Sequence, residues 1–181
     1  MATNTQILKD GSTVTIRPVR PDDAASNAAF IEALSPASKH FLFLGGVPRM
    51  NAPALQRLCE PREGRDMAFV AFSADEPARQ IGVCRYAGAT PHIGAEISIA
   101  VADDWQHKGL GNSLLDRLIE YARAQGITRL YSMDAANNTR MRTLAQHFGF
   151  AESPDPDDIH QVIFSLDIPC ATGRDVCRAS S

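Results

Sequence analysis

The sequence has few cysteines, and they lie far apart. Its 181 residues include Cys59, Cys84, Cys170 and Cys177, which form no Cys-x-x-Cys pair and no cluster with histidine. Zinc sites and disulfide frameworks use such close spacings, so we expect neither here and predict no metal. With 44% hydrophobic residues in a chain of single-domain length, a buried core is sufficient to hold the fold.

Long apolar runs and an excess of one charge are also missing. No stretch approaches the roughly 20 apolar residues of a membrane span, and residues 1–10 lack the apolar core of a secretory signal. We therefore expect a cytoplasmic protein with no membrane partner. The 18 basic and 21 acidic residues give a net charge of -3, which does not favour nucleic-acid binding.

Alternating and helical patterns follow one another along the chain. The stripe Leu110, Leu114, Leu118 predicts an amphipathic helix, whereas alternation around Glu96 predicts a half-buried strand. The same reasoning gives strands at 13–16, 67–72, 80–86, 95–101, 129–133 and 162–166, and helices at 22–34, 37–44, 52–59, 109–126 and 139–148. This order predicts one α/β domain over residues 1–168, followed by a disordered tail over residues 169–181.

The most informative segment is a glycine loop, Gln106-His107-Lys108-Gly109-Leu110-Gly111, which lies between a strand and the long helix. Glycines at a helix start expose N–H groups, and with the helix dipole they favour a phosphate or pyrophosphate. A Walker A loop requires Lys-Ser/Thr after its last glycine, which is missing here. A dinucleotide fingerprint requires a third glycine, but that position is Leu114.

The pattern Gln-x-x-Gly-x-Gly, after a strand that carries a glutamate, resembles the acetyl-CoA loop of GNAT N-acetyltransferases. Residues 16–23 (Ile-Arg-Pro-Val-Arg-Pro-Asp-Asp) resemble the first strand and helix start of that family, and residues 138–150 resemble its late helix and Gly-Phe pair. Within the family, residues 35–41, 64–68, 95–97 and 138–141 are similar to the acetyltransferase domain of Pat-type bacterial protein lysine acetyltransferases.

The resemblance implies a fold and a cofactor site. It implies a mixed, mostly antiparallel sheet of six to seven strands flanked by helices, with one strand splayed from its neighbour to admit the pantetheine arm of acetyl-CoA. It also implies that Asn138 reaches the pantetheine end. The remaining residues expected to contact the cofactor are Ile99, Ala100, Val101, Gln106, His107, Lys108, Gly109, Leu110, Gly111 and Asn112.

The implied reaction needs a neutral amine and a proton for the departing thiolate. Near neutral pH roughly one lysine amine in a thousand is deprotonated, so a general base helps. The resemblance assigns this role to Glu96; the alternative is that Glu96 points to solvent or pairs with an arginine. Many relatives place a tyrosine four residues before the glycine of the Gly-Phe pair to protonate the thiolate. Here that residue is Ala145, so either water or another residue supplies the proton, or the protein does not catalyse the reaction efficiently.

These observations predict an acetyl-CoA-dependent N-acetyltransferase that acts as a monomer or homodimer. A protein lysine is one acceptor to consider, and a small amine such as a polyamine, an amino acid or a drug is the other. A non-catalytic acetyl-CoA-sensing domain is an alternative of another class, which Ala145 supports.

Overall fold

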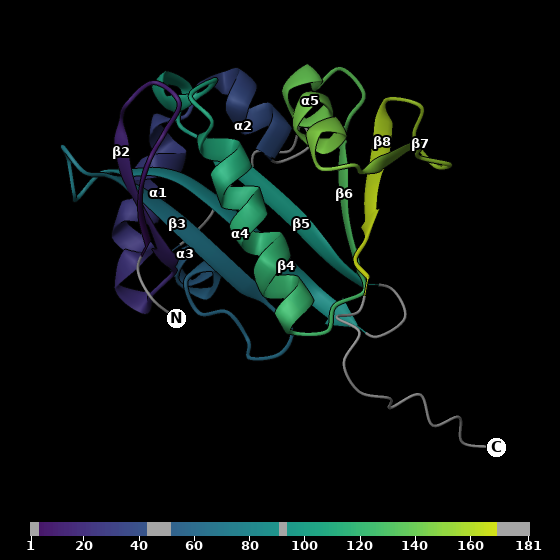
Figure 1. Ribbon diagram of the computed structural model, residues 1–181, viewed down its shortest axis with the longest axis horizontal. Coiled ribbons are helices and arrows are strands. Elements are labelled where there is room, and N and C mark those ends of the chain that lie inside the picture. The colour runs from purple at the N-terminus through teal and green to yellow at the C-terminus, as the bar shows by residue number, and fades with distance from the viewer. Residues whose placement is uncertain (1–3, 43–51, 91–93, 170–181) are drawn as a thin grey trace.

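The computed structural model describes residues 4–42, 52–90 and 94–169, apart from the side chains at positions 52 and 55. An eight-stranded sheet runs through these residues in the order β1-β2-β3-β4-β5-β6-β8-β7 (Figure 1). All neighbouring strands are antiparallel except β5 and β6, which are parallel. The strands are β1 (Asn4–Ile7), β2 (Thr13–Pro18), β3 (Met67–Ser73), β4 (Gln80–Thr90), β5 (Gly94–Val101), β6 (Arg129–Ala135), β7 (Ala151–Pro154) and β8 (Gln161–Asp167).

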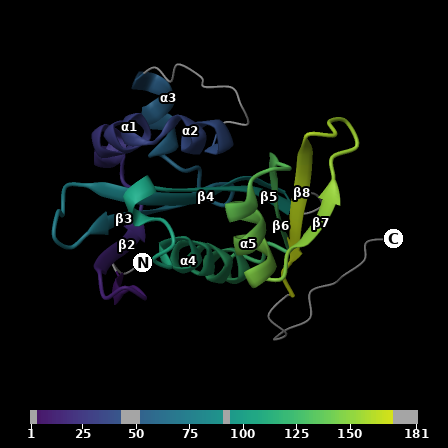
Figure 2. The ribbon, with the colours of Figure 1, turned by 90° about the horizontal axis from the view of Figure 1, so that it is seen from above.

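Helices cover both faces of this sheet. Figure 2 shows α1, α2 and α3 on one face and α4 and α5 on the other. None of the described helices combines the length and apolar character that crossing a membrane requires. The helices are α1 (Ala24–Ala33), α2 (Pro36–Leu42), α3 (Ala52–Leu58), α4 (Leu110–Ala124) and α5 (Thr139–His147), with short 3-10 turns at Pro21–Asp23 and Asp103–Trp105.

The long helix α4 packs against the centre of the sheet. Its apolar stripe, including Leu110, Leu114 and Leu118, is fully buried, as the sequence spacing predicts. Close approach is possible because Gly82 on β4 has no side chain; a Cβ there would lie 2.9 Å from Leu114 Cδ1. The buried thiol of Cys84 donates a hydrogen bond to Leu114 O at 3.2 Å, so this cysteine serves the core.

The parallel strands β5 and β6 pair only at their first residues. The pairs are Ala95 with Leu130 and Glu96 with Tyr131, and beyond them no pairing is found (Figure 1). Gly94 lies at the vertex with φ +92°, and a Cβ there would lie 2.4 Å from Arg129 O. A side chain at this position would therefore push the two strands apart at their point of contact. The strands diverge toward the N-terminus of α4, which positions the candidate site.

The predicted fold class is confirmed, but the predicted strand number is too low. Each expected helix and strand is present to within a few residues, except that residues 43 and 44 of one expected helix lie outside the described residues, as do residues 170–181 of the expected tail. The sequence analysis missed β1 and β7. Both are four-residue edge strands with largely exposed side chains, so neither shows the alternation by which a strand is recognised.

Candidate active site

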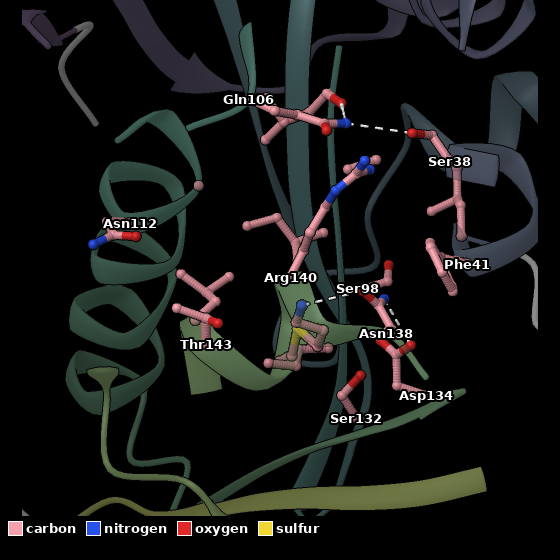
Figure 3. A pocket seen from close by; sticks show the side chains of 18 of the residues that line it. Ser38, Phe41, Ser98, Gln106, Asn112, Ser132, Asp134, Asn138, Arg140 and Thr143 are labelled. Carbon is pink, nitrogen blue, oxygen red and sulfur yellow. Dashed lines mark hydrogen bonds between the residues drawn. The ribbon is translucent and has the colours of Figure 1, made fainter. Parts of the chain in front are cut away.

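A cavity of about 560 Å³ opens where β5 and β6 diverge. Its walls come from these two strands, from α2, from the start of α4 and from α5 (Figure 3). Among the residues expected at the site, those that line it are Glu96, Ile99, Ala100, Val101, Gln106, His107, Gly109, Gly111, Asn112 and Asn138. One cavity thus brings together the strand, the glycine loop and the late helix.

Two of the expected residues, Lys108 and Leu110, are not among the lining residues. Leu110 is fully buried in the core. The Lys108 ammonium lies 3.3 Å from Asp10 Oδ2 and 4.6 Å from the centroid of the Trp105 ring. The ammonium group of this loop lysine therefore contacts Asp10 and Trp105, and Lys108 does not line the cavity.

The loop reaches its shape through two left-handed backbone positions. His107 has φ +63° and Gly109 has φ +94°, and Gly109 is the N-cap of α4. Glycine adopts this region of backbone dihedral angles freely, whereas the same conformation costs a residue with a Cβ about 1–2 kcal/mol of conformational free energy. A strained His107 next to a helix N-terminus is typical of a loop shaped for a ligand.

Lys9 is a basic lining residue that the sequence analysis missed. It follows β1, and its backbone N–H donates to Lys108 O at 3.3 Å. Its side-chain carbons lie 3.5–3.8 Å from where a Cβ on Gly109 would be. Because the contact joins positions 9 and 109, no local pattern in the sequence indicates it.

Gln106 connects the loop to α2 and to the end of β5. Its Nε2 donates to Val101 O at 3.1 Å and to Ser38 Oγ at 3.3 Å (Figure 3). The side chain therefore braces the end of β5 against α2, a structural role that the resemblance does not by itself reveal.

Asp103 holds the start of α2 beside the same loop. It accepts hydrogen bonds from Ser35 N at 2.9 Å, Ser35 Oγ at 2.8 Å and Ser38 Oγ at 2.7 Å. Burial acts to raise the pKa of Asp103, but these hydrogen bonds and the charge of Arg140 outweigh it and lower that pKa. The carboxylate stays ionised and keeps α2, with the lining residue Phe41, against the cavity.

Asn138 is engaged on both ends of its side-chain amide. Its Oδ1 accepts from Met141 N at 3.2 Å and so caps α5. Its Nδ2 donates to Asp134 Oδ1 at 2.8 Å. Asn138 lines the cavity, and its side chain fixes where α5 begins.

Asp134 is a second carboxylate in the cavity that the sequence analysis missed. Its residue is 8% exposed. Burial raises the pKa of Asp134 to about 6, while hydrogen bonds from Asn138 and from the Ala135 N–H act to lower it. The available signal was the alternation of β6, in which Leu130, Ser132 and Asp134 point inward together.

Glu96 is exposed on β5 and lines the cavity. Its neighbours in the sheet are Ala87 on β4 and Tyr131 on β6. Among the described residues it forms no ion pair within 4.0 Å, so the arginine-paired alternative is not what the structure shows. The described residues also contain no group of three or more His, Cys, Asp or Glu side chains arranged to hold a metal ion.

Comparison with known proteins identifies the family. The model of the acetyltransferase (GNAT) family matches residues 37–150. The chain belongs to the GNAT family. A Pseudomonas aeruginosa protein named as an acetyltransferase is 40% identical over 160 residues, covering 88% of this chain and 86% of that protein. GNAT membership and this relative together make the chain an N-acetyltransferase.

More distant relatives show how the family varies. The L-methionine sulfoximine/L-methionine sulfone acetyltransferase of Pseudomonas aeruginosa is 31% identical over 96 residues, covering 51% of this chain and 56% of that protein. In structure, the GNAT domain of Pat from S. lividans superposes with a TM-score of 0.81 at 24% identity, covering 92% of this chain and 97% of that one. The RimL ribosomal-protein acetyltransferase, solved in complex with coenzyme A, has a TM-score of 0.71 at 14% identity, covering 90% and 98%.

Proposed function

We propose that this GNAT enzyme binds acetyl-CoA between β5 and β6 and transfers the acetyl group to a primary amine, with Glu96 as general base. The observation that carries the proposal is that Glu96, the unpaired edge of β5 and the loop before α4 share one cavity.

The splayed edge of β5 suits the pantetheine arm. After Glu96 the strand has no partner on its β6 side, so the backbone groups of Ile99 and the N–H of Val101 face the gap without a strand to bond, whereas Val101 O accepts from Gln106 Nε2. Such groups need hydrogen-bond partners when water is displaced. The amide groups of pantetheine supply donors and acceptors of the right kind, as an added strand would.

The start of α4 suits the pyrophosphate. Its first N–H groups have no helical partner, and the helix dipole favours an anion there. Gly109 and Gly111 keep the approach open, since neither presents a side chain to the cavity. Lys9 lies beside this loop and adds a positive charge.

Glu96 takes the proton from the amine nitrogen as the nitrogen attacks the thioester carbonyl. A backbone N–H of β5 stabilises the oxyanion that develops. Positioned proton transfer of this kind contributes about 10²–10⁴-fold to a rate. Phe41 and Leu42 of α2 line the cavity too and provide an apolar wall for the stem of the acceptor amine.

The acceptor is either a protein lysine or a small amine. The Pat-like segments favour a lysine, whereas a relative named for methionine sulfoximine and methionine sulfone favours an amino acid or similar small amine. An acetyl-CoA sensor would need the binding residues but not Glu96.

Mass spectrometry of coenzyme A release tests these alternatives. Wild type and Glu96→Gln are compared with lysine-bearing proteins and with small amines, beside Glu63→Gln as a control, because Glu63 is exposed outside the cavity. Release with one acceptor, lost in Glu96→Gln and kept in Glu63→Gln, supports the enzyme and names its acceptor class. Binding of acetyl-CoA without release above the blank for any acceptor would favour the sensor.

A further inference from the structure

Asp134 lies on β6, opposite β5 across the gap that opens where the two strands diverge. The last paired residues are Glu96 and Tyr131, so continuing the register three residues along each strand places Asp134 opposite Ile99. Alternation along β6 places Asp134 on the face of Leu130 and Ser132, and Leu130 pairs with Ala95. This is the face covered by α4 and α5, whereas Glu96 points to the other face.

The two oxygens of the Asp134 carboxyl group have different surroundings. Oδ1 accepts both hydrogen bonds that the group makes, from Asn138 Nδ2 at 2.8 Å and from Ala135 N at 2.8 Å. Oδ2 accepts none from the part of the chain that the structure describes. Since Asp134 lines the cavity (Figure 3), Oδ2 is the oxygen available to a ligand there.

Among the described residues that line the cavity, Asp134 is the one buried acid on this face. Ala145 on α5 is fully buried and carries only a methyl group. The other titratable side chains that line the cavity are Lys9 and His107 near the glycine loop, Glu96 on the opposite face of the sheet, and Arg140 and His147 on α5. All five of these residues are exposed. On β8, the residue paired with Asp134 is the apolar Val162.

We propose that Asp134 supplies the proton that the departing thiolate of coenzyme A takes up. The proposal rests on the proposed function. As the C–N bond forms and the C–S bond breaks, the nitrogen of the neutral amine loses one proton to Glu96 and the sulfur gains one from Asp134 Oδ2, directly or through one water. Glu96 then releases its proton to solvent, and Asp134 regains one from solvent, so no proton is created or lost.

The surroundings of Asp134 favour the protonated form that this role requires. Burial already raises the pKa of Asp134 to about 6. A ligand that fills the cavity removes more water from the carboxyl group and raises that pKa further. We therefore expect Asp134 to take up a proton from solution when acetyl-CoA binds near neutral pH.

Asp134→Asn is the informative variant because its side-chain oxygen still accepts from Asn138 and from the Ala135 N–H, which keeps the cap of α5. Calorimetry of acetyl-CoA binding at pH 7, in buffers of different ionisation enthalpy, measures the protons taken up. We expect a substantial fraction of one proton for the wild type and for Asp116→Asn, a control at an exposed position on α4, and close to none for Asp134→Asn.

Turnover gives the second readout. We expect kcat of Asp134→Asn to fall by about 10²-fold, its alkaline decline with pH to disappear, and the Kd for acetyl-CoA to change less than threefold. A raised Kd with unchanged kcat, an unchanged pH profile, or no proton uptake by the wild type overturns the proposal. If the wild type acetylates no amine, the proposed function fails and this inference with it; normal transfer by Asp134→Asn overturns this inference alone.

Discussion

Glu96 and Asp134 line one cavity from adjacent strands while pointing to opposite faces of the sheet. The parallel pairing that ends at Glu96 produces this arrangement, because the cavity begins where the strands separate and is reached from both faces. A group that removes a proton from the amine and a group that gives one to the thiolate can then act on the two sides of one thioester.

The burial of Asp134 has a cost in stability that a neutral side chain avoids. Burial in the folded chain raises the pKa of Asp134 from its ordinary value of 3.8 to about 6, so between these pH values the folded chain holds a proton that the unfolded chain has lost. Stability therefore falls as the pH rises through this window. We predict that Asp134→Asn raises the free energy of unfolding by about 3 kcal/mol at pH 8 and changes it little at pH 4.

Urea denaturation at the two pH values checks this prediction. Asp116→Asn is the control, since its exposed side chain predicts no difference that depends on pH. An Asp134→Asn variant that is less stable than the wild type at pH 8 would contradict the account of this carboxyl group.

The vertex of β5 and β6 depends on Gly94. Gly94→Ala introduces a left-handed alanine and also brings its Cβ to 2.4 Å from Arg129 O, where neither backbone can give way easily. Gly11→Ala has φ +85° with nothing within 4 Å of the new Cβ, so it carries the strain without the clash. We predict a loss of about 1–2 kcal/mol for Gly11→Ala and of about 1–3 kcal/mol more for Gly94→Ala.

Chemical denaturation of both variants measures the difference. Acetyl-CoA affinity, measured by calorimetry, should weaken in Gly94→Ala and stay the same in Gly11→Ala, because only the first alters where the strands diverge. Equal losses of unfolding free energy in the two variants would show that β5 and β6 accommodate the added methyl group without a further loss of stability.

The left-handed Gly109 shapes the loop that we assign to the pyrophosphate. Gly109→Ala opposes that conformation by about 1–2 kcal/mol, which corresponds to roughly a tenfold increase in the Kd for coenzyme A if the loop relaxes in the free protein. Gly126, at the other end of α4 and outside the cavity lining, has φ +74° with nothing within 4 Å of an added Cβ, so Gly126→Ala is a control that carries the same backbone strain away from the loop. Titration calorimetry with coenzyme A compares the two variants. Equal affinities would show that the left-handed conformation of Gly109 does not contribute to coenzyme A binding.

The helices and most of the strands could be predicted because each depends on a pattern within a short stretch of the sequence. The stripe of Leu110, Leu114 and Leu118 needs only a helical period, and the loop before it needs only its glycines at the right spacing. The short edge strands β1 and β7 gave no such signal, because pairing with a neighbour rather than an alternating pattern makes them strands.

The finer features of the site depend on contacts between distant parts of the chain. Lys9 contacts the loop although about a hundred residues separate them in the sequence, and the side-chain amide of Gln106 donates hydrogen bonds to Ser38 and Val101. Asp134 looks like an ordinary polar residue in the sequence, and only burial between β6 and α5 changes its chemistry. The resemblance to the family indicates which positions belong to the site, whereas the hydrogen-bond and packing partners of each side chain depend on the folded structure.

The rate of acetyl transfer by Glu96→Gln tests the central claim most directly. It is measured at saturating acetyl-CoA with the best acceptor, together with the Kd for acetyl-CoA and with Glu63→Gln as the control. The account predicts that Glu96→Gln binds acetyl-CoA as the wild type does but transfers its acetyl group at least about 10²-fold more slowly. A Glu96→Gln variant that transfers at the wild-type rate would contradict it.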